Sequence, residues 1–245
     1  MKTIPNKNMS AHEVKTLLTK GKITSGGEAT ICKGENPHTL YKIFESFGEP
    51  IAMGYNKERK IIELYVCNPD YTVKPISTIS LDGTIIGYEL TDEYTFDSFK
   101  NDYDLWKLDK NELRHFLNET KRILEYFSSK DIIYGDITPR NILFNRYTGE
   151  IKFCDIDNIQ IYNYKMDMIP FILADYYEFR DIDDGVHPYM HNFMTLNALG
   201  LDLYCSTTHE FRKSFKRPGR KVIESMKNIE TFNDEYIITH LKNKL

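Results

Sequence analysis

Three polar side chains are spaced in a way that suits transfer of a phosphoryl group from a nucleotide. Asp136 and Asn141 lie five residues apart in the stretch IIYGDITPRNILF (132–144), and Asp155 follows the apolar run IKFC. Such transfer needs an orienting carboxylate for the acceptor and oxygen ligands for magnesium. Asp136 suits the first role, and Asn141 and Asp155 suit the second. A lone Asp or Asn in a loop is ordinarily turn chemistry, so the hypothesis depends on the combination.

The segment that leads into this loop has the pattern of an amphipathic helix. Asp109 and Glu112 form a capping-box-like start. The residues that then recur at helical spacing form one stripe: Leu113, Phe116, Leu117, Thr120, Ile123, Leu124 and Phe127. After the loop, IKFCDID (151–157) is an apolar, strand-like run that is predicted to place Asp155 at a strand end.

The first 90 residues are predicted to be mainly strands with a single helix. TLYKIF (39–44) and TIIGYEL (84–90) are apolar and β-branched or aromatic, and LDG (81–83) is a turn signal before the second strand. Between the two strands, NKERKIIELYV (56–66) has helical periodicity. Its apolar side is expected to hold Ile61, Ile62 and Val66.

Together these motifs resemble the protein kinase-like superfamily over most of the chain. The resemblance implies an α+β, bilobal protein kinase-like fold with a β-rich N-lobe (1–90) and a mainly helical, shortened C-lobe (91–245) that carries a reduced substrate platform. Asp136 corresponds to the catalytic aspartate of that family, and Asn141 and Asp155 correspond to its metal ligands. The implied cofactors are ATP and Mg²⁺.

The resemblance also implies an ATP site in the N-lobe. ITSGGEATICKG (23–34) is similar to a glycine-rich loop, in which backbone N–H groups approach phosphate closely. Lys42 resembles the strand lysine that contacts the phosphates, with Glu58 as its preferred ion-pair partner and Glu63 as the alternative. The implied ATP-binding residues are Gly26, Gly27, Ile31, Lys42, Glu58, Glu89 and Leu90. In this alignment the backbone of 89–91 is the hinge that meets adenine, and Gly87 is a small gatekeeper.

The sequence departs from the family pattern at several positions, and three functions stay open. Gly135, Thr138 and Asp157 stand where arginine, lysine and glycine are usual. Asp157 would add a metal contact or cap a turn. The preferred function is a protein serine/threonine kinase of divergent bacterial or viral type. The alternatives are a weak or inactive pseudokinase that binds nucleotide or a protein partner, and a small-molecule kinase similar to aminoglycoside and choline phosphotransferases.

Composition narrows the partners. The net charge of −4 argues against a dedicated nucleic-acid binder. The resemblance implies that the acceptor is a protein or a small hydroxylated molecule. The basic segment Arg212 to Lys221 is either a solvated patch or a docking site for an acidic partner.

No run approaches 18 apolar residues and no signal-like segment is present, which predicts a cytoplasmic protein without a membrane span. The four separated cysteines predict reduced, buried thiols.

Overall fold

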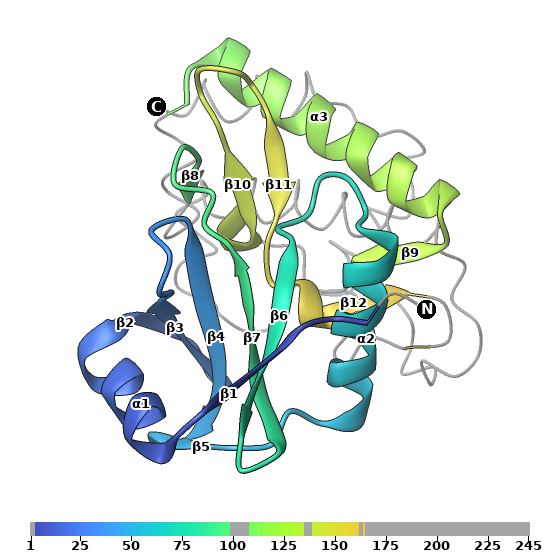
Figure 1. Ribbon diagram of the computed structural model, residues 1–245. Coiled ribbons are helices and arrows are strands. Elements are labelled where there is room, and N and C mark those ends of the chain that lie inside the picture. Colours follow the sequence, from blue (N-terminus) through green and yellow to red (C-terminus); the bar gives the residue numbers. More distant parts are fainter. Residues whose placement is uncertain (1–2, 99–107, 135–138, 162–163, 165–245) are drawn as a thin grey trace, which may run out of the picture. The chain divides into compact units, whose positions relative to one another are not determined.

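The computed structural model describes residues 3–98, 108–134, 139–161 and 164. These residues form a mixture of strands and helices with a β-rich N-terminal region, as the sequence predicts at this coarse level (Figure 1). The chain divides into two compact units, Met1–Thr95 (unit 1) and Phe96–Leu245 (unit 2). Several residues of the sequence analysis lie outside the described residues: Gly135, Asp136, Thr138, Cys205 and the basic segment 212–221.

Unit 1 is built on a seven-stranded sheet in the order β1-β6-β7-β4-β3-β2, with β5 paired to β4. β1 runs parallel to β6, and the other pairs are antiparallel. The strands are β1 (Asn6–Met9), β2 (Lys22–Ser25), β3 (Ala29–Lys33), β4 (Thr39–Ser46), β5 (Glu49–Pro50), β6 (Pro75–Leu81) and β7 (Thr84–Thr91). Both strands predicted from sequence in this region are confirmed, as β4 and β7.

The predicted turn at 81–83 is a two-residue hairpin. Leu81 pairs with Thr84, and the residues between them, Asp82 and Gly83, have φ values of 49° and 79°. Positive φ at both central residues is what a type I′ hairpin requires, and Asp-Gly is a sequence that adopts it readily. The hairpin fixes how β6 and β7 pair.

The predicted lobe boundary differs from the division of the chain in the structure. A boundary after Leu90 falls inside β7, whereas the two units divide after Thr95.

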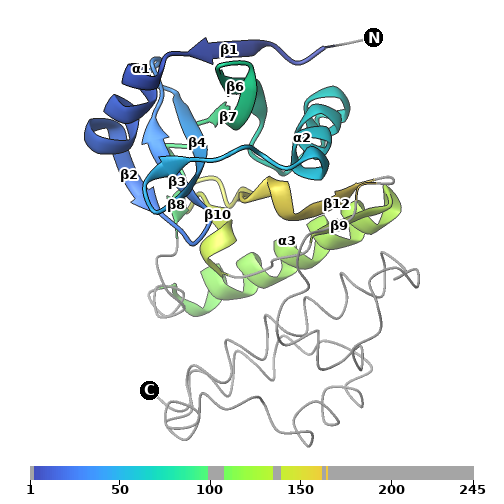
Figure 2. The same cartoon turned by 90° about the horizontal axis from the view of Figure 1, so that it is seen from below.

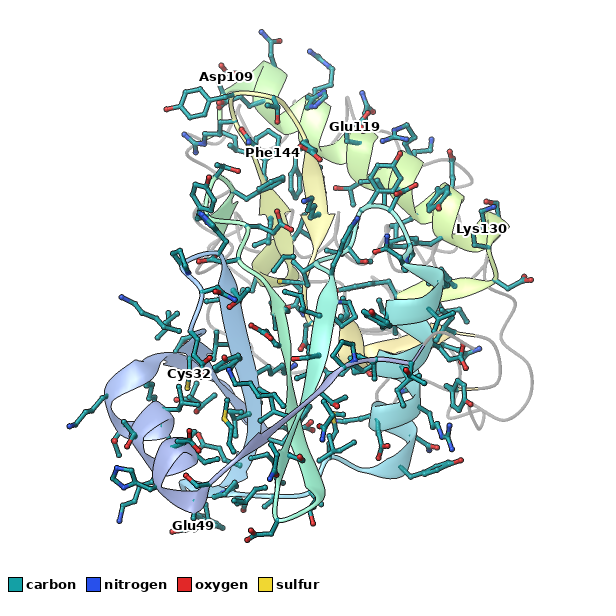
Figure 3. The ribbon with its side chains drawn as sticks, viewed as in Figure 1. Cys32, Glu49, Asp109, Glu119, Lys130 and Phe144 are labelled. Carbon is teal, nitrogen blue, oxygen red and sulfur yellow. The ribbon has the colours of Figure 1, made fainter. Side chains whose placement is uncertain are left out.

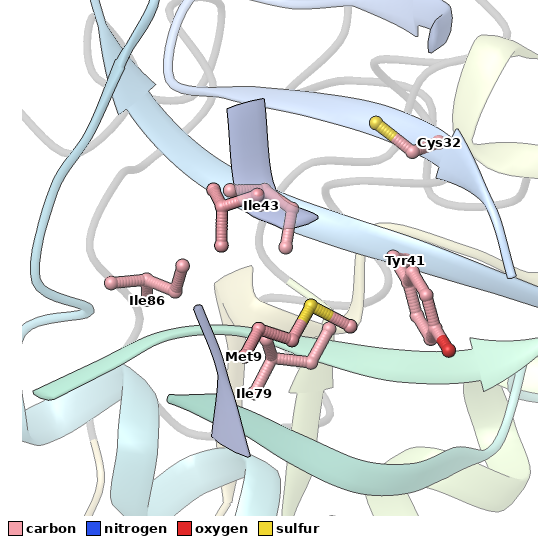
Figure 4. Close-up of a cluster of buried hydrophobic side chains, with 7 residues drawn as sticks. Met9, Cys32, Tyr41, Ile43, Ile79 and Ile86 are labelled. Atoms are coloured by element: carbon pink, nitrogen blue, oxygen red, sulfur yellow. The ribbon is translucent and has the colours of Figure 1, made fainter. Parts of the chain in front are cut away.

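Alternation along β4 gives the sheet two different faces, because successive strand side chains point to opposite sides. Tyr41 and Ile43 are fully buried on one face, in a hydrophobic cluster with residues from β1, β3, β6 and β7. Figure 4 shows this cluster, which contains Met9, Val14, Cys32, Tyr41, Ile43, Ile79 and Ile86. We call this side of the sheet the apolar face. Lys42 and Phe44 lie on the other side, which we call the charged face.

The apolar face is covered by a helical segment that the sequence analysis did not predict. It consists of α1 (Ala11–Thr16) and the π-helical turn η1 (Leu17–Gly21). A capping box begins α1: the Glu13 N–H donates to Ser10 Oγ (3.3 Å), and the Ser10 N–H donates to Glu13 Oε2 (2.7 Å). These hydrogen bonds hold the pKa of Glu13 below its ordinary value. Unit 1 therefore has more than the single helix expected.

The charged face carries α2 (Tyr55–Cys67), the helix predicted at 56–66. Its buried side differs from the prediction. Ile61 is buried as expected, but Val66 is 40% exposed, and Lys60 and Leu64 complete the buried side. Lysine was counted as polar, although its long aliphatic stem packs like an apolar side chain. In Figure 2 the strands of the sheet lie between α1 and α2.

The described residues of unit 2 form one long helix, α3 (Lys110–Ser129), and two small sheets in the orders β11-β10-β8 and β12-β9. The predicted capping box is confirmed, since Asp109 and Glu112 exchange hydrogen bonds of 2.7 and 2.9 Å. The other elements within the described residues of this unit are β8 (Asp97–Ser98), β9 (Ile132–Tyr134), η3 (Pro139–Asn141), β10 (Ile142–Phe144), β11 (Ile151–Phe153), η4 (Ile156–Asn158) and β12 (Ile159–Ile161).

The predicted stripe of α3 is buried wherever its side chains are described, at Phe116, Thr120, Ile123, Leu124 and Phe127. The rings of Phe116 and Phe144 meet edge to face at 5.8 Å, and those of Phe127 and Phe153 do so at 5.6 Å. Figure 3 shows α3 running from Asp109 past Glu119 to Lys130, with Phe144 on β10. The helix is therefore held against β10 and β11, the strands that flank the predicted metal ligands.

The helices and cysteines bear on two further predictions. None of the helices within the described ranges is long and apolar enough to cross a membrane. Cys32 is fully buried, and burial raises the pKa of its thiol to about 11. Cys154 is partly buried, but Cys67 is exposed at the end of α2. The prediction of buried thiols is right for Cys32 and wrong for Cys67.

Candidate functional site

The two predicted metal ligands of unit 2 come together at one end of a strand pair. Asn141 directly precedes β10, and Asp155 follows β11 by two residues. Ile142 is the register partner of Phe153, and the Cys154 N–H donates to the Asn141 carbonyl oxygen at 2.9 Å. Asn141 and Asp155 are 14 positions apart in sequence. The hydrogen bond from Cys154, the residue before Asp155, holds their two segments together.

A third strand fixes the same point. The Tyr134 hydroxyl, at the end of β9, donates to the carbonyl oxygen of Cys154. Tyr134 is fully buried, and its ring meets that of Phe153 at 4.8 Å. Both backbone groups of Cys154 are therefore held, its N–H by Asn141 and its carbonyl by Tyr134. These two hydrogen bonds fix the backbone directly before Asp155.

Asp155 has an unusual backbone conformation. Its φ and ψ are 59° and 48°, in the left-handed region, which costs a non-glycine residue roughly 1–2 kcal/mol. It occupies the N-cap position of η4, yet its side chain makes no capping hydrogen bond there. Asp157 lies inside η4 and is buried. Residues held in such conformations cluster at functional sites, because the surrounding structure must enforce them.

The donor set suits a hard cation with few protein ligands. In the part of the chain that the structure describes, no group of three or more His, Cys, Asp or Glu side chains could hold a metal ion. Magnesium is commonly bound through one or two protein oxygens, with phosphate and water completing the shell. Asn141 and Asp155 fit that requirement, and they do not form a closed protein cage.

In unit 1 the register of the strands determines which face of the sheet each predicted ATP-binding residue occupies. Lys42 on β4 is opposite Ile31 on β3, and Leu40 is opposite Leu90 on β7. Because directly opposed residues share a face, Ile31, Lys42 and Leu90 all lie on the charged face. Lys42 is only 9% exposed.

Glu89 does not join this group. It is opposite Tyr41, which places its side chain on the apolar face, where it accepts a hydrogen bond from Ser77 Oγ at 2.9 Å. The predicted hinge also differs from the structure. Glu89 and Leu90 lie inside β7 and pair with both β4 and β6. Their backbone groups therefore serve the sheet, and a backbone contact with adenine requires residues beyond Thr91.

The first residue beyond β7 is Asp92. Its N–H donates to the His38 carbonyl oxygen at 2.9 Å, so the chain is still anchored as it leaves the sheet. Burial raises the pKa of the Asp92 carboxyl, the neighbouring Glu93 raises it further, and His38 opposes the shift.

Gly87 has a structural reason that the sequence did not reveal. A Cβ at this position would lie 2.2 Å from the Lys42 carbonyl oxygen and 3.1 Å from Ile43 Cα. Only glycine allows β7 to approach β4 so closely at this point. The sequence predicts that Gly87 is a small gatekeeper. In the structure, its small size lets β7 pack closely against β4 beside Lys42.

The glycine-rich turn connects β2 and β3. The Gly26 N–H donates to the Ala29 carbonyl oxygen at 2.8 Å, and both Gly26 and Gly27 are exposed. Neither has a positive φ, and a Cβ at Gly27 would meet nothing within 4 Å. Neither backbone conformation nor packing inside unit 1 requires glycine at position 27. The loop backbone is accordingly open to an approaching group.

Two further residues of this region were not singled out from the sequence. Glu28, next to Gly27, forms an ion pair with Lys57 in the first turn of α2. Lys57 sits 5.0 Å from the centre of the Phe44 ring on the charged face. Glu58 is half-buried in the same helical turn, and its ion pair with Lys42 stays a prediction.

No protein-family model and no curated protein matches this chain.

Proposed function

We propose that this protein is an ATP- and magnesium-dependent phosphotransferase of the protein kinase-like type, with a bilobal fold whose C-lobe is mainly helical and shortened. The observation that carries the proposal is the convergence of Asn141 and Asp155 at one end of the β10–β11 pair, with Asp155 held in a left-handed conformation. The sequence predicts these two residues as metal ligands from their chemistry and from the resemblance to the kinase family. A hydrogen bond that joins their segments supports the same role.

The proposed roles follow from the chemistry of each side chain. In unit 1, Lys42 binds phosphate oxygens, and in unit 2, Asn141 and Asp155 bind magnesium. Bound magnesium neutralises negative charge that develops on the transferred group. Asp136 orients the acceptor hydroxyl and accepts its proton. The glycine-rich turn brings the backbone N–H of Gly27 to phosphate, and the hydrogen bond from the Gly26 N–H to the Ala29 carbonyl oxygen shapes that turn.

The preferred acceptor is a serine or threonine hydroxyl of a protein, and the proposed compartment is the cytoplasm. Four charged or metal-binding groups are retained together, at Lys42, Asp136, Asn141 and Asp155. A pseudokinase would have no need of all four, so their joint retention favours turnover.

The test is thermal unfolding of the full chain with ATP, with and without magnesium. A ligand at 100 times its dissociation constant adds about 2.7 kcal/mol to the free energy of unfolding. For a chain of this size that raises Tm by roughly 5–10 °C. We expect a magnesium-dependent shift in the wild type that is largely lost in Asp155→Asn, because asparagine keeps the left-handed conformation but removes the charge.

Asp82→Asn is the matched control, since Asp82 also has a positive φ (49°) but lies in the β6–β7 turn. It should keep the full shift. A folded wild type without any ATP-dependent shift would contradict the proposal and favour a partner-binding pseudokinase. Turnover is tested separately: Asp136→Ala should abolish phosphate transfer to a generic acceptor protein while ATP affinity stays nearly unchanged.

A further inference from the structure

The charged face of unit 1 gathers two ammonium groups around one aromatic ring. Lys42 Nζ lies 5.6 Å from the centre of the Phe44 ring, and Lys57 Nζ lies 5.0 Å from it. One lysine comes from β4 and the other from α2, so they meet only in the folded protein. Each gains from the electron-rich ring face, and both add positive charge to this side of the sheet. The arrangement favours an anion with more than one charge.

A loop residue supplies one negative charge to this cluster. Glu28 directly follows Gly26 and Gly27, and its carboxylate pairs with Lys57, 29 residues away in sequence. The Glu28 side chain is 61% exposed and that of Lys57 is 19% exposed. An ion pair whose carboxylate is largely exposed contributes little to stability, so a stronger anion exchanges with that carboxylate at low cost. The pair also ties the glycine-rich turn to α2.

We propose that Lys57 is a second phosphate-binding cation and that Glu28 is its exchangeable counter-ion. A polyphosphate that binds along the open glycine-rich turn to Lys42 also reaches Lys57 and displaces the Glu28 carboxylate. The turn is thereby released from α2 when the ligand binds. This inference rests on the proposed function for the identity of the ligand, and it adds a specificity for polyphosphate over nucleosides without phosphate.

Exchange makes a prediction that a purely structural ion pair does not. Lys57→Gln removes a charged contact to phosphate, which should weaken polyphosphate binding roughly tenfold. Glu28→Gln removes the competing carboxylate and should tighten the same binding by up to about fivefold. The two substitutions therefore shift affinity in opposite directions. If the pair only holds the turn in place, both substitutions break it, and both shift affinity in the same direction.

The chain offers a matched control pair. Lys7 and Glu35 form an ion pair of 2.6 Å in the same unit, with side chains 28% and 69% exposed. Lys7 Nζ also lies 5.2 Å from the centre of an aromatic ring, that of Tyr41 on the apolar face. Lys7→Gln and Glu35→Gln should leave polyphosphate affinity unchanged. Lys57→Arg keeps the charge and should restore affinity to within about threefold of the wild type.

The experiment is calorimetric titration of the full chain at low ionic strength with three probes: ATP with magnesium, inorganic tripolyphosphate and adenosine. Opposite shifts for ATP in Glu28→Gln and Lys57→Gln, with adenosine affinity unchanged, would support the inference. ATP binding that moves in the same direction in both variants, or in neither, would overturn it and leave the proposed function standing. Opposite shifts for tripolyphosphate with no binding of ATP would support the phosphate site and overturn the proposed function. A wild type that binds neither ATP nor tripolyphosphate would overturn both the inference and the proposed function.

Discussion

The two faces of the unit 1 sheet are made by the same strands but are built for different purposes. On the apolar face, Tyr41 and Ile43 are fully buried under α1 and η1. On the charged face, the Phe44 ring is approached by Lys42 from the same strand and by Lys57 from α2. An eight-residue strand, β4, thus carries a hydrophobic core on one side and a cluster of positive charge on the other.

The comparison teaches that stability and ligand binding can be changed separately in this unit. Burial of aliphatic side chains on the apolar face gives stability that requires neither charge pairing nor a ligand. The charged face carries Lys42 and Lys57, whose positive charges attract an anionic ligand. Substitutions on the first face should alter unfolding, and substitutions on the second should alter binding.

The largest expected effect comes from Ile43→Ala on the apolar face. Ile43 is fully buried, so the change should lower the free energy of unfolding by about 2–5 kcal/mol through lost burial and a residual cavity. The additional stabilisation by ATP and magnesium should stay at the wild-type value, measured by urea unfolding with and without ligand. Ile31→Ala, on the neighbouring strand but on the charged face, is the matched variant.

Ile31 is half-buried and directly opposite Lys42. Its truncation should cost less stability than that of Ile43 and should reduce the stabilisation by ATP. If Ile43→Ala abolished the ligand effect while Ile31→Ala preserved it, the assignment of the two faces would be reversed.

A smaller effect is expected at Gly87, where the two faces are coupled. Gly87→Ala places a methyl group against the Lys42 carbonyl oxygen, and the strands must separate to relieve the contact. Overpacking of this kind costs about 1–3 kcal/mol. Because the displaced residue is Lys42, ATP affinity should fall as well. Gly27→Ala is the control for stability, since a Cβ there meets nothing within 4 Å; a stability loss as large as that of Gly87→Ala would contradict the reason given for Gly87.

Local patterns allowed much of the described fold to be predicted. Asp109 and Glu112 predict where α3 begins, because a capping box is a contact within four residues. The same kind of box at Ser10 and Glu13 was overlooked, since α1 is only six residues long and gives little periodicity. Asp155 could be recognised by its type and by the strand before it.

Features that depend on register or distant contacts could not be predicted. Glu89 falls on the apolar face because an irregularity in β6–β7 pairing between Ile79 and Ser80 sets the phase of β7. No local pattern fixes such an irregularity. The Glu28–Lys57 pair joins a turn to a helix, and in sequence Lys57 is one of several charges in NKERK. These contacts exist only once the sheet and α2 are packed.

The smallest expected effect concerns Lys7, the apolar face's counterpart of Lys57. Partial burial lowers the pKa of Lys7, but its hydrogen bonds to Glu35 and Tyr41 outweigh that effect and hold the pKa above its ordinary value of 10.5. A raised pKa in the folded state means that the protonated lysine adds stability below pH 10.5 and that this contribution is lost as the pH rises through the folded-state pKa.

Urea unfolding of the wild type and Lys7→Gln from pH 8 to pH 11 should therefore show two curves that converge at the alkaline end, with the wild type more stable at pH 8. The ATP affinity of both proteins should be equal at pH 8, in contrast to Lys57→Gln. Curves that stay parallel across this range would mean that the Lys7 charge contributes nothing to folding. The contrast between the two faces would then rest on the buried aliphatic residues alone.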